Sequence, residues 1–489
     1  MFVTDWKVIG PELFLGTAVQ LLLLLGVWYG SRSPYPILLK PIAVLSMWTV
    51  VLTLWLMEST NTFYGSVWND SFVFDSLARN VQIWILLGTL ISLGLSLAYS
   101  NKEKMYAYES SIFMLFAAFG LIGLVAAQDF LAFYLTLELQ SFSFYILAAS
   151  KRTSQFSTES GLKYFVLGAV ASGFLLFGGS LLYGATGSLS FTDWMNLNLV
   201  IPSTNMFLLG MLFMFVGILF KVSAFPFHVW TPDVYEGAPT SVTAFFALVP
   251  KIGMFLVLAK LLSGAFYVSL PYWQTVLAVV ALGSMVIGSL GALGQRKLKR
   301  LLAYSTISHV GFIVLGFSTG AVEGIQGAFF YLMIYFIMTI ASFALLIGWQ
   351  YSNTRLKSVQ DLAGLGRQHP VLGLGIAMLF FSLAGIPPLA GFFSKYVVFQ
   401  AALASQFYVI TLLAVVTSVI GAVYYLRIVK TLFFPKETSS TPTTIVVWND
   451  VGAFPAYLFA FSVTFLMVFW FYPTPLLMIA QSWSYTLFP

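Results

Sequence analysis

Residues 205–232 read NMFLLGMLFMFVGILFKVSAFPFHVWTP, and this stretch decides the fold class. Its apolar part carries no charge before Lys221 and is long enough to cross most of a hydrocarbon core of about 30 Å as a helix. No water is available in that core, so each backbone amide needs a partner within its own segment, which a helix provides. Pro226 lacks a backbone donor, and it predicts that this long membrane helix is broken in its middle.

The rest of the chain follows the same pattern. Of its 489 residues, 59% are hydrophobic and 8% are charged. Apolar runs of about 20 residues recur from end to end, and they are too uniformly apolar for barrel strands, which alternate at every second residue. We therefore predict an all-α polytopic membrane protein with about 14 transmembrane helices. The predicted ranges are 12–30, 37–57, 80–99, 107–127, 129–149, 160–184, 205–232, 241–263, 273–293, 301–319, 324–349, 371–404, 407–433 and 453–479.

The predicted helix 371–404 is also long and interrupted. Its middle reads AGIPPLAGFFSK from Ala384 to Lys395, so glycine and proline again stand near a lysine. The two broken helices are the seventh and the twelfth, which suggests two repeats, helices 4–8 and helices 9–13. We therefore divide a single domain, 1–489, into four parts. These parts are 1–106 with helices 1–3, 107–263 with the first repeat, 273–433 with the second repeat, and 434–489 with the C-terminal helix.

The composition argues against several kinds of chemistry. The chain has no cysteine, so it offers no disulfide and no thiolate ligand for iron–sulfur clusters or zinc. Nothing resembles a dinucleotide, Walker or HExxH motif, so we expect no bound nucleotide and no metal. The net charge of +6 comes from basic residues in every second connection, such as 296–300, and indicates membrane orientation rather than nucleic-acid binding. Arg79 is assigned to one of the other connections, and 12–30 is taken as the first helix rather than as a cleaved leader.

Five charged residues fall inside the predicted helices: Glu138, Lys163, Lys221, Lys251 and Lys395. A central charge costs roughly 2.5–3.5 kcal/mol on insertion scales, so five unpaired charges would cost on the order of 15 kcal/mol. Snorkelling from helix ends is the ordinary explanation for a single such residue, but it suits a set of this size poorly. We therefore expect an ion path through the interior of the helix bundle.

A lysine and a carboxylate of adjustable separation can act as a proton switch. A lysine in low dielectric favours its neutral form, and a nearby carboxylate restores the charged form. Glu138 and Lys221 are the expected pair, while Lys251 and Lys395 would extend the path laterally. A lone histidine on a helix is usually a satisfied polar residue, but His309 lies between two lysine-bearing regions, so we expect it to relay protons.

Two further positions each allow two interpretations. Lys163 either modulates the expected pair or binds Glu159, which lies four residues earlier on the same helix. His228, with Asp233 and Glu236, follows the first break. These three side chains either take up protons or cap the end of a half-helix.

Five segments together resemble a known family. They carry four of the five charged residues, all but Lys251, together with both breaks, and the similarity covers nearly the whole chain. The family is the antiporter-like subunits of respiratory complex I, and the subunit 2 type, which is the N type in bacteria, is the most similar. The segments are 138–145 (ELQSFSFY), 160–164 (SGLKY), 220–239 (FKVSAFPFHVWTPDVYEGAP), 300–311 (RLLAYSTISHVG) and 385–395 (GIPPLAGFFSK).

The resemblance implies a fold and a role for the charged residues. It implies 14 helices, with helices 4–8 and 9–13 forming two inverted repeats. It also implies a proton half-channel around Glu138, Lys163 and Lys221, a connecting lysine at Lys251, and Lys395 in a second half-channel. The implied activity is proton translocation coupled to quinone reduction elsewhere in a large assembly.

The resemblance also implies what surrounds the chain. NADH, FMN, iron–sulfur clusters and ubiquinone would bind to other subunits, and none of them to this chain. The partners would be other membrane-arm subunits, including neighbouring antiporter-like subunits, together with membrane lipids and protons, but no nucleic acid. The expected location is the mitochondrial inner membrane, or alternatively a bacterial plasma membrane. Two other hypotheses remain: a stand-alone cation/proton antiporter of the Mrp type, and a structural spacer whose charges move no protons.

Overall fold

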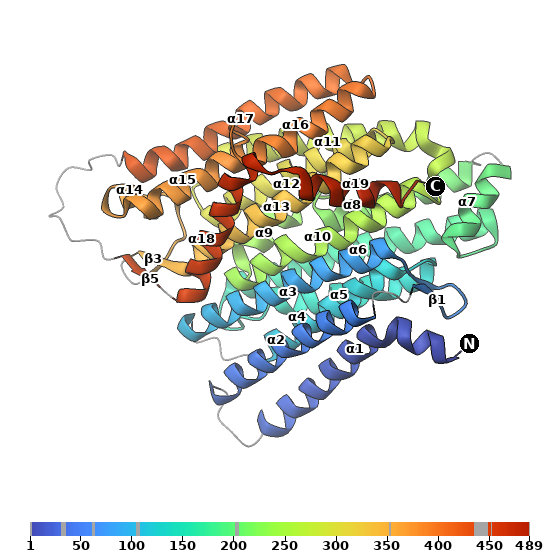
Figure 1. Cartoon of the computed structure of the whole chain (residues 1–489), viewed down its shortest axis with the longest axis horizontal. Helices are drawn as coiled ribbons and strands as arrows, with labels where there is room; N and C mark the ends of the chain where they lie inside the picture. Colours follow the sequence, from blue (N-terminus) through green and yellow to red (C-terminus); the bar gives the residue numbers. More distant parts are fainter. Residues whose placement is uncertain are drawn as a thin grey trace. The chain divides into compact units, whose positions relative to one another are not determined.

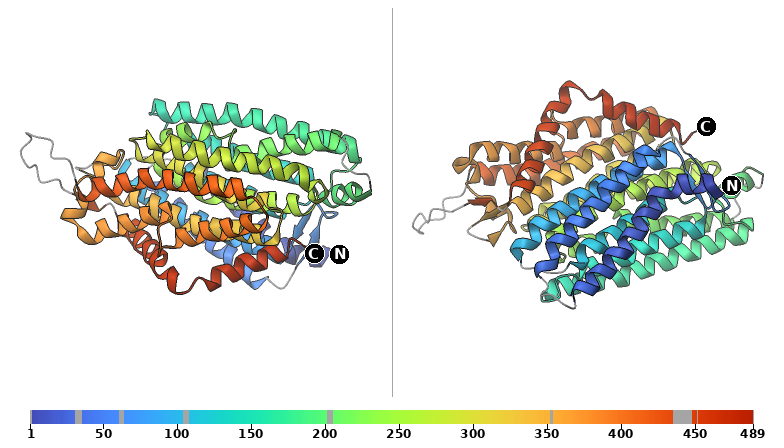
Figure 2. Two further views of the ribbon diagram at one scale, coloured as in Figure 1. Left: turned by 90° about the horizontal axis from the view of Figure 1, so that it is seen from above. Right: turned by 60° about the horizontal axis from the view of Figure 1, so that its bottom comes forward.

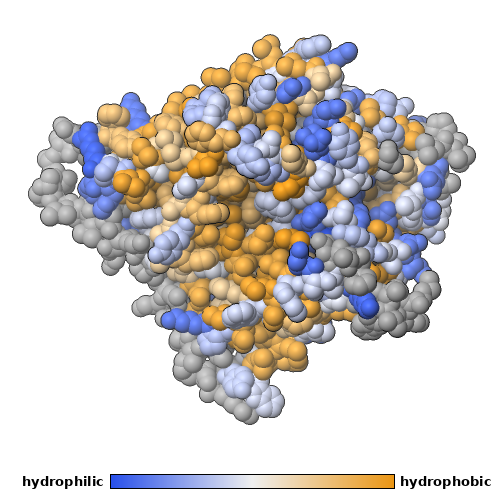
Figure 3. Space-filling view, in the orientation of Figure 1, coloured by the Kyte–Doolittle hydropathy of each residue, from blue (hydrophilic) through white to orange (hydrophobic). Residues whose placement is uncertain are grey.

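The chain forms long, mostly apolar helices in the computed structural model (Figure 1). The structure describes residues 2–30, 36–60, 64–103, 108–200, 205–351, 354–434, 448–450 and 452–488. Within these ranges, 13 helices are long and apolar enough to cross a membrane, and Pro370–Ala384 is a shorter apolar helix. Apolar side chains cover the central part of the face seen in the space-filling view (Figure 3). The prediction of an all-α polytopic membrane protein is confirmed.

The chain divides into two compact units. The first unit contains Met1–Val222 and Gly237–Pro271, and the second contains Ser223–Glu236 and Tyr272–Pro489. The division therefore falls inside the predicted seventh helix, at the residue where its regular helical part ends. The inverted relation between the two predicted repeats, and the division of the chain into four parts, stay predictions.

The first unit surrounds one buried helix. Its elements are α1 (Phe2–Gly30), α2 (Pro36–Ser59), β1 (Gly65–Val67), β2 (Phe72–Phe74), α3 (Ser76–Glu103), α4 (Glu109–Ala126), α5 (Phe130–Ala148), α6 (Gln155–Thr186), α7 (Phe191–Val200), α8 (Asn205–Val222), α10 (Thr240–Ser263) and the 3-10 turn η1 (Tyr267–Ser269). The buried helix is α10, which packs against α3, α4, α5 and α8. Helices α1 and α2 lie side by side (Figure 2), and α6 packs against α5 and α8 with its other side exposed.

The second unit is also organised around a central helix. Its elements are α9 (Trp230–Gly237), α11 (Leu270–Leu293), α12 (Leu298–Ser318), α13 (Val322–Gly348), β3 (Trp349–Tyr351), β4 (Thr354–Arg355), η2 (Val359–Leu362), α14 (Leu365–Gln368), α15 (Pro370–Ala384), α16 (Ala390–Ala404), α17 (Tyr408–Phe433), β5 (Trp448–Asp450), α18 (Ala453–Val468), η3 (Phe469–Phe471) and α19 (Thr474–Tyr485). Helix α13 is almost wholly buried and packs against α12, α15, α16, α18 and α19. The strands form a small antiparallel sheet in the order β4-β3-β5.

The first break separates α8 from α9. Helix α8 ends at Val222, and Ser223 adopts a positive φ of 68°. The backbone N–H of Phe225 donates to Ser284 Oγ, on α11, at 2.9 Å. Irregular backbone is tolerated at membrane depth where protein groups satisfy its hydrogen bonds, and Ser284 meets this need for one such group.

The second break separates α15 from α16. Gly385, which follows the last residue of α15, has a φ of +84°, in the left-handed region that favours glycine. A Cβ at this position would also lie 2.9 Å from Lys395 Cδ. Across the break, the N–H of Gly391 donates to Ser382 Oγ at 3.2 Å. The backbone conformation therefore favours glycine at position 385, and a larger residue there would also have to displace the Lys395 side chain.

The last predicted helix, 453–479, differs from the structure in its second half. Helix α18 ends at Val468, and α19 begins at Thr474 after the turn η3. The residues Pro473 and Pro475 explain the difference, because neither can donate a backbone hydrogen bond to a preceding turn. Proline is tolerated at the first turn of a helix, so the same residues suit the start of α19.

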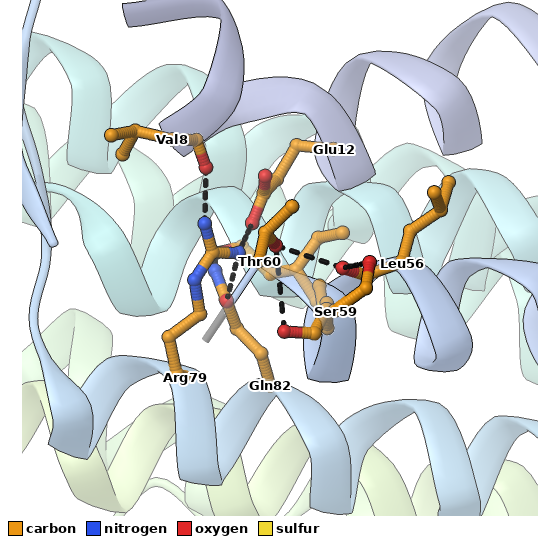
Figure 4. A network of polar contacts seen from close by, with 9 residues as sticks. Val8, Glu12, Leu56, Ser59, Thr60, Arg79 and Gln82 are labelled. Atoms are coloured by element: carbon orange, nitrogen blue, oxygen red, sulfur yellow. Dashed lines mark hydrogen bonds and ion pairs between the residues drawn. The ribbon is translucent and has the colours of Figure 1, made fainter. Parts of the chain in front are cut away.

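A buried ion pair joins the first helices of the chain (Figure 4). Arg79 on α3 donates through Nη1 to Glu12 Oε1 on α1 at 2.6 Å, and the two side chains are 1% and 6% exposed. Arg79 Nη2 also donates to the carbonyl of Val8, and Gln82 donates to the carbonyl of Ile122 on α4 at 2.9 Å. The assignment of Arg79 to a connection was therefore wrong. Helix α3 begins earlier than predicted, at Ser76.

Candidate functional site

Lys221 lies in the last turn of α8 and faces a polar stripe on α5. Its side chain is buried, and Nζ donates to Ser141 Oγ at 2.7 Å and to Tyr145 OH at 3.4 Å. Nζ also lies 5.6 Å from the centre of the Tyr145 ring. Glu138, Ser141 and Tyr145 follow one another at helical spacings of three and four residues, so they share one face of α5. The ammonium is thus held by hydroxyl oxygens and an aromatic ring.

Glu138 is joined to Lys221 only indirectly. Its Oε1 accepts a hydrogen bond from Ser172 Oγ, on α6, at 2.5 Å. Among the described residues, no direct ion pair links Glu138 to Lys221. Ser141, one turn along α5, supplies the hydroxyl that the lysine contacts instead. The two members of the predicted pair are therefore separated, with Ser172 bound to the carboxylate and with Ser141 and Tyr145 bound to the ammonium.

Lys163 lies on the exposed side of α6. It forms an ion pair with Glu159 at 2.8 Å, and the two side chains are 43% and 57% exposed. Of the two interpretations of Lys163, this contact corresponds to pairing with Glu159. The buried residues of α6 point instead toward α5 and α8.

Lys251 follows Pro250 on α10 and is 2% exposed. Helix α10 packs against α3, α4, α5 and α8, and all of its residues except Lys260 are buried. A nearby glycine on the same helix, Gly253, faces Leu121, Ile85 and Val125, which are all apolar. The lysine is therefore buried in the interior of the first unit, as an ion path requires.

His309 is the centre of a hydrogen-bonded cluster in the second unit. Its Nδ1 lies 2.6 Å from Tyr331 OH on α13, and its Nε2 lies 3.1 Å from Tyr425 OH on α17. Tyr425 OH in turn contacts Ser305 Oγ, one turn before His309 on α12. The sequence analysis did not identify these hydroxyl partners. The available signal was the spacing of four residues between Ser305 and His309, which places both polar groups on one helix face.

Lys395 on α16 lies against the second break. Nζ donates to the carbonyl of Ala384 at 2.7 Å and to Ser418 Oγ, on α17, at 2.9 Å. The Ala384 carbonyl belongs to the last turn of α15, which is the negative end of the helix dipole and favours a cation. The ammonium also lies 5.1 Å from the centre of the Phe312 ring. The ammonium of Lys395 is thus bound by neutral groups only among the contacts of the described residues: a carbonyl exposed by the break, a hydroxyl and an aromatic ring.

The polar residues after the first break divide into two groups. The ring of half-buried His228 lies 6.0 Å from that of Phe225 within the irregular segment. On α9, Glu236 accepts hydrogen bonds from Lys297 and, at 3.0 Å, from Arg300, which also lies 3.2 Å from Asp233. The two carboxylates therefore tie α9 to the beginning of α12.

Replacing Glu236 by glutamine should weaken this connection in a pH-dependent way. Burial opposes ionisation of Glu236, but the hydrogen bonds from Lys297 and Arg300 outweigh it and lower its pKa below the ordinary 4.5. The carboxylate therefore stabilises the fold above about pH 4.5, and this contribution is lost as the pH falls through the lowered pKa.

We expect Glu236→Gln to destabilise the protein by on the order of 1 kcal/mol at neutral pH. The measurement is thermal melting of both proteins in detergent at about pH 7 and about pH 4, where the difference should shrink. If the two proteins differed in melting temperature by the same amount at both pH values, the ionised carboxylate of Glu236 would not be the source of the stabilisation.

The buried lysines define what the arrangement can do chemically. Lys221 and Lys395 are held by neutral oxygens and aromatic rings, so each can lose and regain a proton without leaving a carboxylate unpaired. Within the described ranges, no group of three or more His, Asp or Glu side chains is placed to hold a metal ion. Together with the two broken helices, these features define a polytopic membrane protein with titratable groups along its interior, the class that contains proton translocators.

Comparisons with known proteins identify the family. The family model described as "NADH:quinone oxidoreductase/Mrp antiporter, TM" matches residues 127–421. NADH-ubiquinone oxidoreductase chain 2 of Marchantia polymorpha is 40% identical over 98% of both chains. NADH-quinone oxidoreductase subunit N of Paramagnetospirillum magneticum is 40% identical over 98% of this chain and 97% of its own. A chain of respiratory complex I from Thermus thermophilus has 31% identity, covers 96% of this chain with 98% of its own length, and superposes with a TM-score of 0.78.

The chain therefore belongs to this transmembrane family, and within it to the group of chain 2 and subunit N proteins. The resemblance found in the sequence is confirmed at the level of the family. The parts played by the individual charged residues stay predictions.

Proposed function

We propose that this chain is an antiporter-like membrane-arm subunit of a proton-pumping NADH:quinone oxidoreductase, in which buried lysines and Glu138 carry protons. The observation that supports it most is the placement of Lys221. The buried ammonium of Lys221 is held by Ser141 and Tyr145 of α5, and Glu138 lies one turn away from Ser141 on α5. The lysine can release or regain its proton as the distance between its ammonium and the Glu138 carboxylate changes. Family membership and the similarity to chain 2 and subunit N proteins support the same assignment.

The proposal includes a division of labour within the complex. The redox reaction takes place in other subunits, which bind NADH, FMN, the iron–sulfur clusters and ubiquinone. The absence of cysteine from this chain is consistent with that division. Its partners are the other membrane-arm subunits, among them neighbouring antiporter-like subunits, and membrane lipids.

The chain is a multi-pass membrane protein. We propose the mitochondrial inner membrane as its location, and a bacterial plasma membrane as the alternative, since relatives of both kinds exist.

Replacing Glu138 by glutamine tests the proposal. Glutamine keeps the size and can still accept the hydrogen bond of Ser172, but it cannot ionise and so cannot attract the proton of Lys221. We expect quinone reduction coupled to proton uptake to slow by at least about tenfold, since a positioned proton-transfer group contributes that much or more. The measurement is the rate of NADH-driven proton uptake, together with the number of protons per electron, in proteoliposomes that contain the whole complex.

A matched control is Ser172→Ala, which removes the hydrogen bond but leaves the carboxylate. It should lower the rate by less than the glutamine variant does. Native gel electrophoresis stained for NADH dehydrogenase activity must show both variants in the large active band. An unchanged rate of proton uptake and an unchanged number of protons per electron in assembled Glu138→Gln complex would favour the structural spacer.

The second candidate is a stand-alone cation/proton antiporter of the Mrp type. The description of the matching family includes such antiporters, so the fold alone does not separate the two. Migration of the chain as a small species without NADH dehydrogenase activity, together with sodium-dependent proton transport by the purified chain, would favour the antiporter.

A further inference from the structure

Phe312 separates two polar regions in the interior of the second unit. It lies on α12, one turn after His309, and its side chain is 1% exposed. One side of the ring stacks on Tyr331, with 6.0 Å between ring centres and 17° between planes. The Nζ atom of Lys395 lies 5.1 Å from the ring centre. Successive contacts therefore lead from His309 to Tyr331, from Tyr331 to Phe312 and from Phe312 to Lys395. The third member of this series, Phe312, is a hydrocarbon ring.

The position of Phe312 affects the protonation of Lys395. An aromatic ring attracts an ammonium through its quadrupole and gives no such attraction to a neutral amine, and the effect is largest where water is excluded. The other polar partners of Nζ are the Ala384 carbonyl and Ser418 Oγ, and neither is charged. Across the described residues, no carboxylate pairs with Lys395. The ring is therefore one of three neutral groups that favour the charged form.

Phe312 also interrupts a chain of hydrogen bonds. Ser305, Tyr425, His309 and Tyr331 are linked through hydroxyl and imidazole atoms, each of which can accept one proton and release another. The Phe312 ring contacts both Tyr331, at one end of this chain, and the Lys395 ammonium, and it offers no donor or acceptor for such a relay. With the ring in this position, no hydrogen bond between the described side chains joins Lys395 to Tyr331.

We propose that Phe312 is a gate between Lys395 and the His309 cluster. With the ring in place, Lys395 keeps its proton. When the ring turns aside, Lys395 Nζ gives a proton to the Tyr331 hydroxyl, which passes its own proton to His309 Nδ1. Lys395 then becomes neutral, His309 becomes an imidazolium, and Tyr331 is unchanged. The inference rests on the proposed function, since it concerns the regulation of the same proton path, and it makes Phe312 a positioning residue.

Two substitutions separate the two effects of the ring. Phe312→Ala opens the space and should allow proton flow without turnover. We expect passive proton leak through proteoliposomes of the whole complex to rise by about fivefold and protons per electron to fall while quinone reduction persists. Phe312→Leu keeps a side chain of similar bulk but loses the π face, so it should lower protons per electron with a smaller leak. Phe399→Leu is the matched control, because Phe399 contacts the Phe312 ring at 5.9 Å on α16 and should leave leak unchanged.

A purely structural role of Phe312 would lower assembly and turnover together without a leak, and that result would overturn the gate. Unchanged leak and stoichiometry in assembled Phe312→Ala complex would overturn it as well. If that variant fails to assemble, the number of protons per electron in Phe312→Leu decides, and a normal number rejects the gate.

Lys395→Met separates this inference from the proposed function. Normal pumping in Lys395→Met would refute the path itself, whereas impaired pumping there with normal Phe312 variants would refute only the gate. Adding Lys395→Met to Phe312→Ala should remove the leak.

Discussion

A complex in which Lys221 is replaced by methionine should assemble but lose most of its proton pumping. Methionine fills a similar volume and is well tolerated in apolar surroundings, so the packing of α8 should survive. What disappears is the Lys221 ammonium, which donates to both Ser141 and Tyr145 and can release and regain a proton. We expect NADH-driven proton uptake to fall by at least about tenfold, in line with the usual contribution of a positioned proton-transfer group.

The matched comparison is Lys163→Met. Lys163 carries the same charge, but it is 43% exposed and paired with Glu159 on the outer side of α6. This pair lies away from the buried face of α6 that packs on α5 and α8, so its loss should change pumping much less than the loss of Lys221. Both variants should be measured as protons per electron and as rate in the same proteoliposomes. Equal losses in the two variants would contradict the distinction between a buried relay and an exposed pair.

Replacing Arg79 by methionine should cause the largest loss of stability among these variants. The substitution leaves Glu12 buried at 5% exposure without its guanidinium, and it removes the hydrogen bond to the carbonyl of Val8. Removing one partner of a buried ion pair typically destabilises a protein by about 3–5 kcal/mol. We expect less chain in the assembled complex and a lower melting temperature in detergent, because α1 loses its polar attachment to α3 (Figure 4).

The double variant Glu12→Leu/Arg79→Met shows whether the loss comes from the unpaired charge. With both charges gone, the buried space contains only apolar groups, and such replacements of a buried pair are often neutral or stabilising. The double variant should therefore be more stable than Arg79→Met alone. If the double variant is as unstable as the single one, the hydrogen bond to Val8 or the shape of the arginine, rather than the ion pair, holds the helices together.

The sequence by itself determined the class of protein and most of its helices. In a hydrophobic run of membrane length, every backbone amide and carbonyl needs a hydrogen-bond partner within the same segment, and a helix provides these partners. This requirement can be read from each segment by itself. The breaks at Pro226 and at Pro387 could be located for the same local reason, because proline removes a donor wherever it stands. The buried positions of Lys221, Lys251 and Lys395 could also be expected from their places in apolar runs.

The tertiary structure alone decided which groups these residues meet. Lys221 contacts Ser141, 80 residues away, and His309 contacts Tyr425, 116 residues away. Such contacts depend on which faces of two helices meet, and residue periodicity within a uniformly apolar helix does not specify those faces. Arg79 shows the same limit, because only its partner on α1 distinguishes a buried pair from an arginine in a connection. The position of Phe312 between Tyr331 and Lys395 likewise arises from the packing of three helices.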